Sequence, residues 1–132
     1  DAPVVADLST LMGIPVFPVT LRGKATKAIL DTGAHLSYIN PDIVAGEESI
    51  GNRQDFYPFT GHFSAPTYLV QTSLDGTPSF DIEYGIPPAS LQGMLSMAMS
   101  MSNSSAVIGT QLLEHFDSTL SWARKQISWK RW

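Results

Sequence analysis

The sequence contains no cysteine, which excludes disulfide bonds, thiol nucleophiles and cysteine-ligated zinc. Because a core of sufficient size needs no disulfide, this absence leaves the cellular compartment open. Charged residues are also scarce, at 15% against 43% hydrophobic residues, a composition too apolar for a disordered or linker-like segment. The net charge of -4 and the pI of about 5.1 argue against a dedicated binder of nucleic acids or anionic membranes.

Long hydrophobic runs are absent as well. The apolar stretches at 28–30 and 106–108 are far shorter than the roughly 18 residues that a membrane span requires, so we expect no span in this chain. A length of 132 residues is typical of one domain, and we predict a single domain over residues 1–132. The chain begins with Asp1 rather than Met, and we expect that a targeting segment or a flanking domain preceded it.

Nine prolines and ten glycines divide the chain into short segments, which favours many strands and turns over long helices. The predicted class is therefore all-β. Alternating apolar residues predict one hairpin over 15–30, with a polar turn at 22–24, and a second hairpin over 67–84 around Asp75-Gly76. Between these hairpins, Asn40-Pro41 predicts the start of a short helical turn, and residues 46–55 are expected to form an exposed loop.

The methionine-rich segment 91–105 is the hardest to interpret. Met97, Met99 and Met101 alternate with small residues at the strand period, which predicts either a buried strand face or an adaptable lining of a groove. Beyond it we expect a strand at 106–108, a short C-terminal helix at 110–116, and two strands at 119–122 and 126–132.

The most informative stretch is 28–39, where an apolar strand leads into Asp31-Thr32-Gly33 and a second apolar strand follows. Glycine allows a tight turn and the close approach of another backbone, so the turn presents the Asp31 carboxylate. The triplet alone is usually an ordinary turn in which the aspartate bonds its own backbone. Its surroundings must therefore decide between a turn and a catalytic loop.

Those surroundings resemble the retropepsin-like aspartic proteases. The apolar run, Asp31-Thr32-Gly33-Ala34 and the segment 37–39 follow one another at the spacing usual in that family. Val107-Ile108-Gly109 and the apolar residues after it resemble the family's second signature. The glycines of the two signatures lie 76 positions apart (109 minus 33), and the resemblance covers roughly residues 13–130 of the sequence. It implies a retropepsin-like acid-protease fold, a closed β-barrel-like single lobe with one short C-terminal helix.

Peptide hydrolysis by this chemistry needs two carboxylates that share one proton, because one activates water while the other polarises the scissile carbonyl. The chain contains a single Asp-Thr-Gly and no Asp-Ser-Gly. An active site therefore requires a homodimer in which Asp31 of each chain meets at a two-fold axis. No cofactor is needed.

The resemblance also implies roles for the residues around Asp31. Thr32 would bond across the dimer axis to its counterpart, and Gly33 would bring backbone close to the substrate. Ala34, His35 and Leu36 would line the substrate groove; for His35, a plain surface histidine is the alternative.

Family members cover the groove with a β-hairpin flap, and the aromatic-rich segment 56–63 is the best candidate. Its tip is predicted at Thr60-Gly61, with Phe59 and His62 beside it. Aromatic side chains around a mobile glycine turn would exclude water from a bound peptide and supply backbone hydrogen bonds to it. The alternative is an ordinary hairpin whose aromatic side chains pack in the core.

Other sites are less well supported. His35, His62 and His115 lack the spacing of metal ligands, so no metal site is expected. Tryptophans and cations alternate near residues 122–132, but a solvated terminal hairpin explains them better than a nucleic-acid surface. We therefore predict an aspartic endopeptidase acting on peptides or proteins. The rival interpretation is a binding or oligomerisation module that keeps the fold without cleaving.

Overall fold

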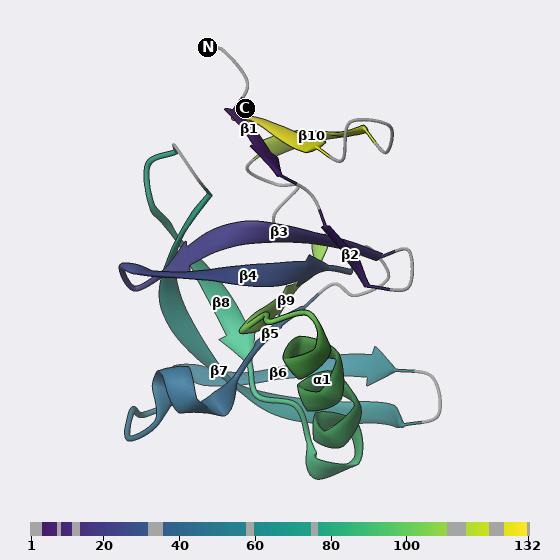
Figure 1. The fold of residues 1–132 in the computed structure, drawn as a ribbon. Helices are drawn as coiled ribbons and strands as arrows, with labels where there is room; N and C mark the ends of the chain where they lie inside the picture. The colour runs from purple at the N-terminus through teal and green to yellow at the C-terminus, as the bar shows by residue number, and fades with distance from the viewer. Residues whose placement is uncertain are drawn as a thin grey trace.

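The structure, a computed structural model, describes residues 4–7, 9–11, 14–31, 36–57, 60–74, 77–110, 116–121 and 126–131. Strands dominate these residues, as the all-β prediction requires, and the single α-helix of the described part lies on one side of them (Figure 1). The elements in chain order are β1 (Val4–Asp7), β2 (Ser9–Leu11), β3 (Ile14–Leu21), β4 (Lys24–Leu30), β5 (Ser37–Ile39), the 3-10 helix η1 (Pro41–Val44), β6 (Gly51–Tyr57), β7 (Gly61–Leu74), β8 (Phe80–Gly85), α1 (Ala89–Met101), β9 (Ala106–Ile108), β10 (Phe116–Ser121) and β11 (Gln126–Arg131).

The strands form a larger and a smaller sheet. The larger sheet has the order β2-β3-β4-β9-β5-β8-β7-β6, and β3 also pairs with the far end of β7 through Val19↔Leu74 and Leu21↔Thr72. This extra pairing curls the sheet until it closes on itself, which confirms the predicted barrel-like form. The smaller sheet has the order β1-β11-β10.

Both predicted hairpins are confirmed. Strands β3 and β4 are joined by Arg22 and Gly23, which have φ angles of +51° and +80°, the left-handed backbone that tight two-residue hairpin turns require. Strands β7 and β8 pair from Thr67↔Gly85 to Thr72↔Phe80. The predicted helical turn is η1, where the Asn40 side chain accepts a hydrogen bond of 3.0 Å from the backbone N–H of Asp42.

The loop predicted for 46–55 is wrong from Gly51 onward, because β6 begins there and pairs with β7. Strand β6 lies at the edge of the larger sheet, so backbone hydrogen bonds to one neighbour hold it and no apolar face is needed. Because most side chains of β6 are polar, the strand has no alternation of apolar residues by which the sequence could predict it. Arg53 of this strand pairs with Glu83 of β8, with 2.9 Å between Nε and Oε2.

The strand predicted in the methionine-rich segment is also wrong, because the segment forms helix α1. Leu91, Leu95 and Met99 are buried at helical spacing, whereas Met94, Met97 and Met101 are 59–66% exposed. Leucine, methionine and alanine favour helices, and this preference outweighed the local alternation. Of the helix predicted at 110–116, Phe116 lies in β10 instead and residues 111–115 fall outside the described residues. The final two strands are confirmed as β10 and β11.

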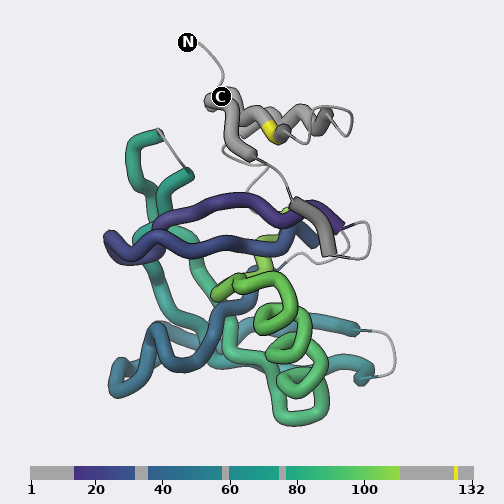
Figure 2. The backbone as a smooth tube through the Cα atoms, in the orientation of Figure 1, coloured from purple at the N-terminus to yellow at the C-terminus, as the bar shows by residue number. Residues whose placement is uncertain are grey.

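The core has two parts, separated by the central strands. Ala28, Leu30 and Ile108 belong to the first cluster, while Ile29 and Val107 belong to the second. Because successive side chains of a strand point to opposite faces, both faces of β4 and β9 are buried, which explains their unbroken apolar sequences. Helix α1 lies on the second cluster, against one side of the sheet (Figure 2).

Removing a side chain that anchors α1 should destabilise the protein strongly. Leu91 is 1% exposed and packs in the second cluster, so Leu91→Ala should lower the free energy of unfolding by about 2–5 kcal/mol through lost burial and a cavity. Met97→Ala on the exposed face is the matched control and should change it by less than about 0.5 kcal/mol. Urea denaturation measures both; equal losses would contradict the assigned packing face.

Candidate active site

The candidate site is built where β9 lies between β4 and β5 (Figure 1). Strand β9 runs parallel to β4, with Leu30↔Ile108 as the last pair, and antiparallel to β5, with Tyr38↔Val107. The backbone N–H of Asp31 donates a hydrogen bond of 2.9 Å to the carbonyl of Ile108. This bond extends the ladder by one residue and fixes the Asp31 backbone at the carboxyl end of β4.

A hydrogen bond from a buried serine joins the two signature segments, because Ser37 belongs to the first and Gly109 to the second. Ser37, at the start of β5, is 0% exposed, and its Oγ accepts a hydrogen bond of 3.0 Å from the backbone N–H of Gly109. Gly109 directly follows β9, so this bond joins the chain leaving β9 to the chain entering β5. The backbone of Asp31 is therefore fixed next to three neighbouring strands, β4, β9 and β5, whose ends are joined by hydrogen bonds.

Ser37→Ala tests the strength of this lock. The variant leaves the buried N–H of Gly109 without its side-chain acceptor, and an unsatisfied buried donor costs about 1–3 kcal/mol. We expect the free energy of unfolding to fall by that amount in urea denaturation. Ser64→Ala, at an exposed position on β7, is the matched control and should be nearly neutral.

The hairpin of β6 and β7 carries the aromatic-rich segment. The last pair of its ladder is Tyr57↔Gly61, and the N–H of Thr60 donates to the carbonyl of Tyr57 at 3.2 Å. Gly61 has a φ of +85°, a left-handed conformation that favours glycine at the turn. Beside the turn, the exposed rings of Phe56 and His62 lie 4.9 Å apart between centroids.

This hairpin reaches the candidate catalytic carboxylate through a tyrosine. The hydroxyl of Tyr57 donates a hydrogen bond of 3.1 Å to Oδ2 of Asp31. In a second bond the hairpin supplies the acceptor instead of the donor: the hydroxyl of Tyr38 in β5 donates to Oδ2 of Asp55 in β6. Burial, followed by the charge of Asp31, raises the pKa of Tyr57, and burial, followed by the hydrogen bond to Asp55, raises the pKa of Tyr38. Both phenols therefore keep their protons and act as donors.

The sequence prediction assigned no role to Tyr57, Tyr38, Asp55 or Ser37 individually. Tyr57 was part of the aromatic-rich segment, but the sequence gives no register between β6 and β7 that would show which aromatic side chain reaches Asp31. The available signal was the position of Tyr57 in the aromatic-rich segment, three residues before the predicted tip at Thr60-Gly61.

The other predicted site residues are placed as follows. Leu36 is 4% exposed and packs in the second cluster, whereas Thr60, Gly61 and His62 lie at the hairpin turn. Within the part of the chain that the structure describes, no group of three His, Asp or Glu residues could hold a metal ion, and no helix is long and apolar enough to cross a membrane. The remaining predicted residues lie outside the described residues: Thr32, Gly33, Ala34, His35, Phe59 and His115.

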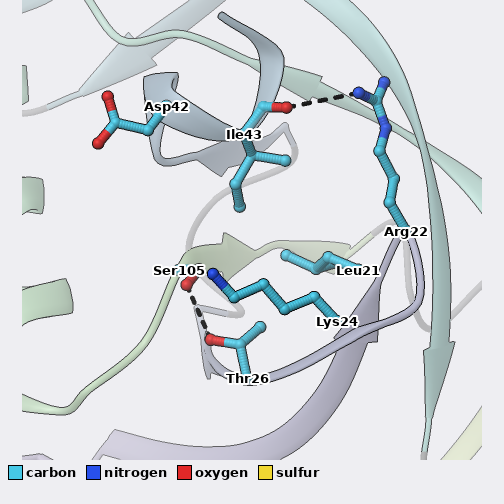
Figure 3. A pocket seen from close by; sticks show the side chains of 7 residues that line it. All are labelled: Leu21, Arg22, Lys24, Thr26, Asp42, Ile43 and Ser105. Atoms are coloured by element: carbon cyan, nitrogen blue, oxygen red, sulfur yellow. Dashed lines mark hydrogen bonds between the residues drawn. The ribbon is translucent and has the colours of Figure 1, made fainter.

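Figure 3 shows a cavity of about 300 Å³. It is lined by Lys24 and Thr26 at the start of β4, whereas Asp31 follows the end of that strand. Across its floor Thr26 and Ser105 share a hydrogen bond of 2.8 Å. Arg22, at its rim, is paired with Glu47, which lowers the pKa of that carboxyl group. The cavity therefore does not include the candidate catalytic carboxylate. It is lined by Leu21, Arg22, Lys24, Thr26, Asp42, Ile43 and Ser105.

Comparison with known proteins gives a structural likeness only. No protein-family model and no curated protein sequence matches the chain. The crystal structure of a retropepsin-like aspartic protease from Rickettsia conorii matches with a TM-score of 0.64 at 13% identity, over 97% of this chain and 89% of that chain. The solution structure of simian foamy virus protease matches with a TM-score of 0.48 at 14% identity, over 71% of this chain and 86% of that one. The likeness to the Rickettsia protein shows that this chain has the retropepsin-like fold.

Proposed function

We propose that this chain, which has the retropepsin-like fold, is an aspartic endopeptidase that acts as a homodimer. The observation that carries the proposal is the position of Asp31, which directly follows β4 and is bonded through its backbone to β9 in a fold found in a known aspartic protease. The single Asp-Thr-Gly of the sequence supports the dimer, because two carboxylates are needed and one chain supplies one.

In the proposed reaction, a water molecule lies between the Asp31 carboxylates of two chains. One carboxylate removes a proton from the water as its oxygen attacks the scissile carbonyl, while the other, protonated, donates its proton to the carbonyl oxygen. The tetrahedral intermediate then collapses: the carboxyl group that took the water's proton gives it to the amide nitrogen, and the C–N bond breaks. The other carboxylate takes back a proton from a hydroxyl group of the intermediate, which leaves an amine, a carboxylic acid and the singly protonated pair. Thr32 would lock the two loops to each other, and Gly33 would let the peptide backbone approach.

We assign the β6–β7 hairpin the role of a flap over the bound peptide. Thr60, Gly61 and His62 lie at its turn, and Tyr57 beside the turn contacts Asp31; Phe59 would add to the aromatic side chains of the flap. A hairpin that reaches the carboxylate is long enough to cover a peptide lying on it and to exclude water. Ala34 and His35 would line the substrate groove, as the resemblance implies, whereas the buried Leu36 would support that segment from the core.

A digestion experiment tests the proposal. The purified protein is incubated with a mixed peptide library at several pH values, beside Asp31→Asn, and new peptide termini are identified by mass spectrometry. We expect internal cleavages with the wild-type chain alone. Retention of library peptides without any cleavage would contradict the endopeptidase and favour the alternative, a binding or oligomerisation module with the same fold.

A further inference from the structure

Two hydrogen bonds cross between the β6–β7 hairpin and the rest of the chain in opposite directions. Tyr57 of the hairpin donates to Asp31 at the end of β4, and Tyr38 of β5 donates to Asp55 of the hairpin. Each bond joins a phenol to a carboxylate, a pairing stronger than a bond between neutral groups. The hairpin is thus held down at two points, and one of them is the candidate catalytic carboxylate.

The rings of the two tyrosines also contact each other. Their centroids lie 5.9 Å apart in an edge-on arrangement, and Phe63 of β7 lies 6.4 Å from Tyr57 and 6.5 Å from Tyr38. Tyr38 is 0% exposed and belongs to the second core cluster, against which Tyr57 and Phe63 pack. Core packing therefore orients the Tyr57 hydroxyl towards Asp31.

The bond from Tyr57 conflicts with the proposed chemistry. The attacking water must hydrogen-bond to the Asp31 carboxylates, and a peptide carbonyl must lie directly above them. The Tyr57 hydroxyl, 3.1 Å from Oδ2, takes one of the acceptor positions of this carboxylate, so it competes with the water and the partner carboxyl group for the carboxylate oxygens. Movement of the Tyr57 hydroxyl away from Asp31 therefore favours hydrolysis.

We propose that Tyr57 is an autoinhibitory latch, which closes the β6–β7 hairpin onto Asp31 in the ligand-free chain and is released when peptide binds. This inference rests on the proposed function for its catalytic meaning, but the latch itself is a property of the folded chain. The bond from Tyr38 to Asp55 does not involve Asp31, and Asp55 pairs with Phe63 two positions before the last pair of the ladder, so this bond holds the hairpin at that point while the turn beyond it moves.

Hydrogen exchange in a double-mutant cycle tests the latch without any need for peptidase activity. The variants are Tyr57→Phe, which removes only the hydroxyl, Asp31→Ala, which removes the acceptor, and the double variant. In the ligand-free protein, each single change should speed exchange of the β6 and β7 amides next to the turn by about tenfold, the worth of a hydrogen bond to a charged group. The double variant should exchange no faster than the single variants, because both remove the same interaction.

Unchanged exchange in Tyr57→Phe, or effects of the two changes that multiply, would overturn the latch. Tyr38→Phe is the matched control: it removes the other phenol–carboxylate bond, and its effect should multiply with that of Asp31→Ala. If Tyr57→Phe alone proves unstable, the comparison of Asp31→Ala with the wild-type chain still decides whether Asp31 holds the hairpin.

The kinetic consequence separates the latch from the proposed function. Because only the open hairpin admits peptide, removing the latch raises the binding-competent fraction and lowers the apparent dissociation constant. Tyr57→Phe should therefore lower KM severalfold, and Tyr38→Phe should not lower it. If no variant cleaves peptide but the exchange cycle behaves as described, the endopeptidase is wrong and the latch stands. If the wild-type chain cleaves and the cycle shows no coupling, the latch is wrong and the endopeptidase stands.

Discussion

Asp31→Asn should fold like the wild-type chain and lose peptidase turnover by about a thousandfold or more, the scale of effect expected when general acid–base groups are removed. An amide neither takes a proton from water nor shares one with a partner carboxyl group. The backbone bond from Asp31 to Ile108 does not involve the side chain, and an asparagine oxygen still accepts from Tyr57. Turnover of an internally cleaved peptide and urea denaturation measure the two expectations.

Asp81→Asn provides the matched control for this substitution. Asp81 is exposed on β8, so the same chemical change there should leave both turnover and stability within experimental error. Turnover by Asp31→Asn comparable to that of the control would contradict the proposed mechanism outright. A large loss of stability in Asp31→Asn would instead assign Asp31 a structural role.

The sequence predicted those parts of the fold that follow from local alternation and turn chemistry. The hairpin around Gly23 and the turn that Asn40 caps were found because the required φ angles and caps are properties of a few neighbouring residues. Helix α1 was missed because its buried residues, Leu91, Leu95 and Met99, have methionines and small residues between them that also fit a strand period.

The candidate site shows a similar division. Asp31 was found because the triplet and the apolar strands around it are contiguous in sequence, and the second signature at 107–109 does lie beside β4 in the structure. The contacts of Asp31 with the hairpin depend on the packing of Tyr38 and Tyr57, which are 19 positions apart (57 minus 38). No local pattern in the sequence specifies such a contact, since it results from the curl of the whole sheet.

Mixing the wild-type chain with Asp31→Asn should lower turnover more than dilution of the wild-type chain alone explains. If subunits exchange freely, an equal mixture contains about one quarter wild-type dimers, one half mixed dimers and one quarter variant dimers. Only the wild-type dimers have both carboxylates, so turnover should fall to about a quarter of that measured for wild-type chain at the same total concentration.

A catalytic single chain would give a different number in the same experiment. Half of the chains would then be competent, and the mixture would retain about half of the turnover. Mixing with Asp81→Asn, which keeps both Asp31 carboxylates in every dimer, should leave turnover unchanged and so controls for losses on exchange. Sedimentation of the same samples measures the fraction of dimer. Turnover per chain should fall at the concentrations where dilution separates the subunits. A mixture that retains half of the turnover, together with activity that does not depend on concentration, would show that Asp31 acts without a second copy of itself.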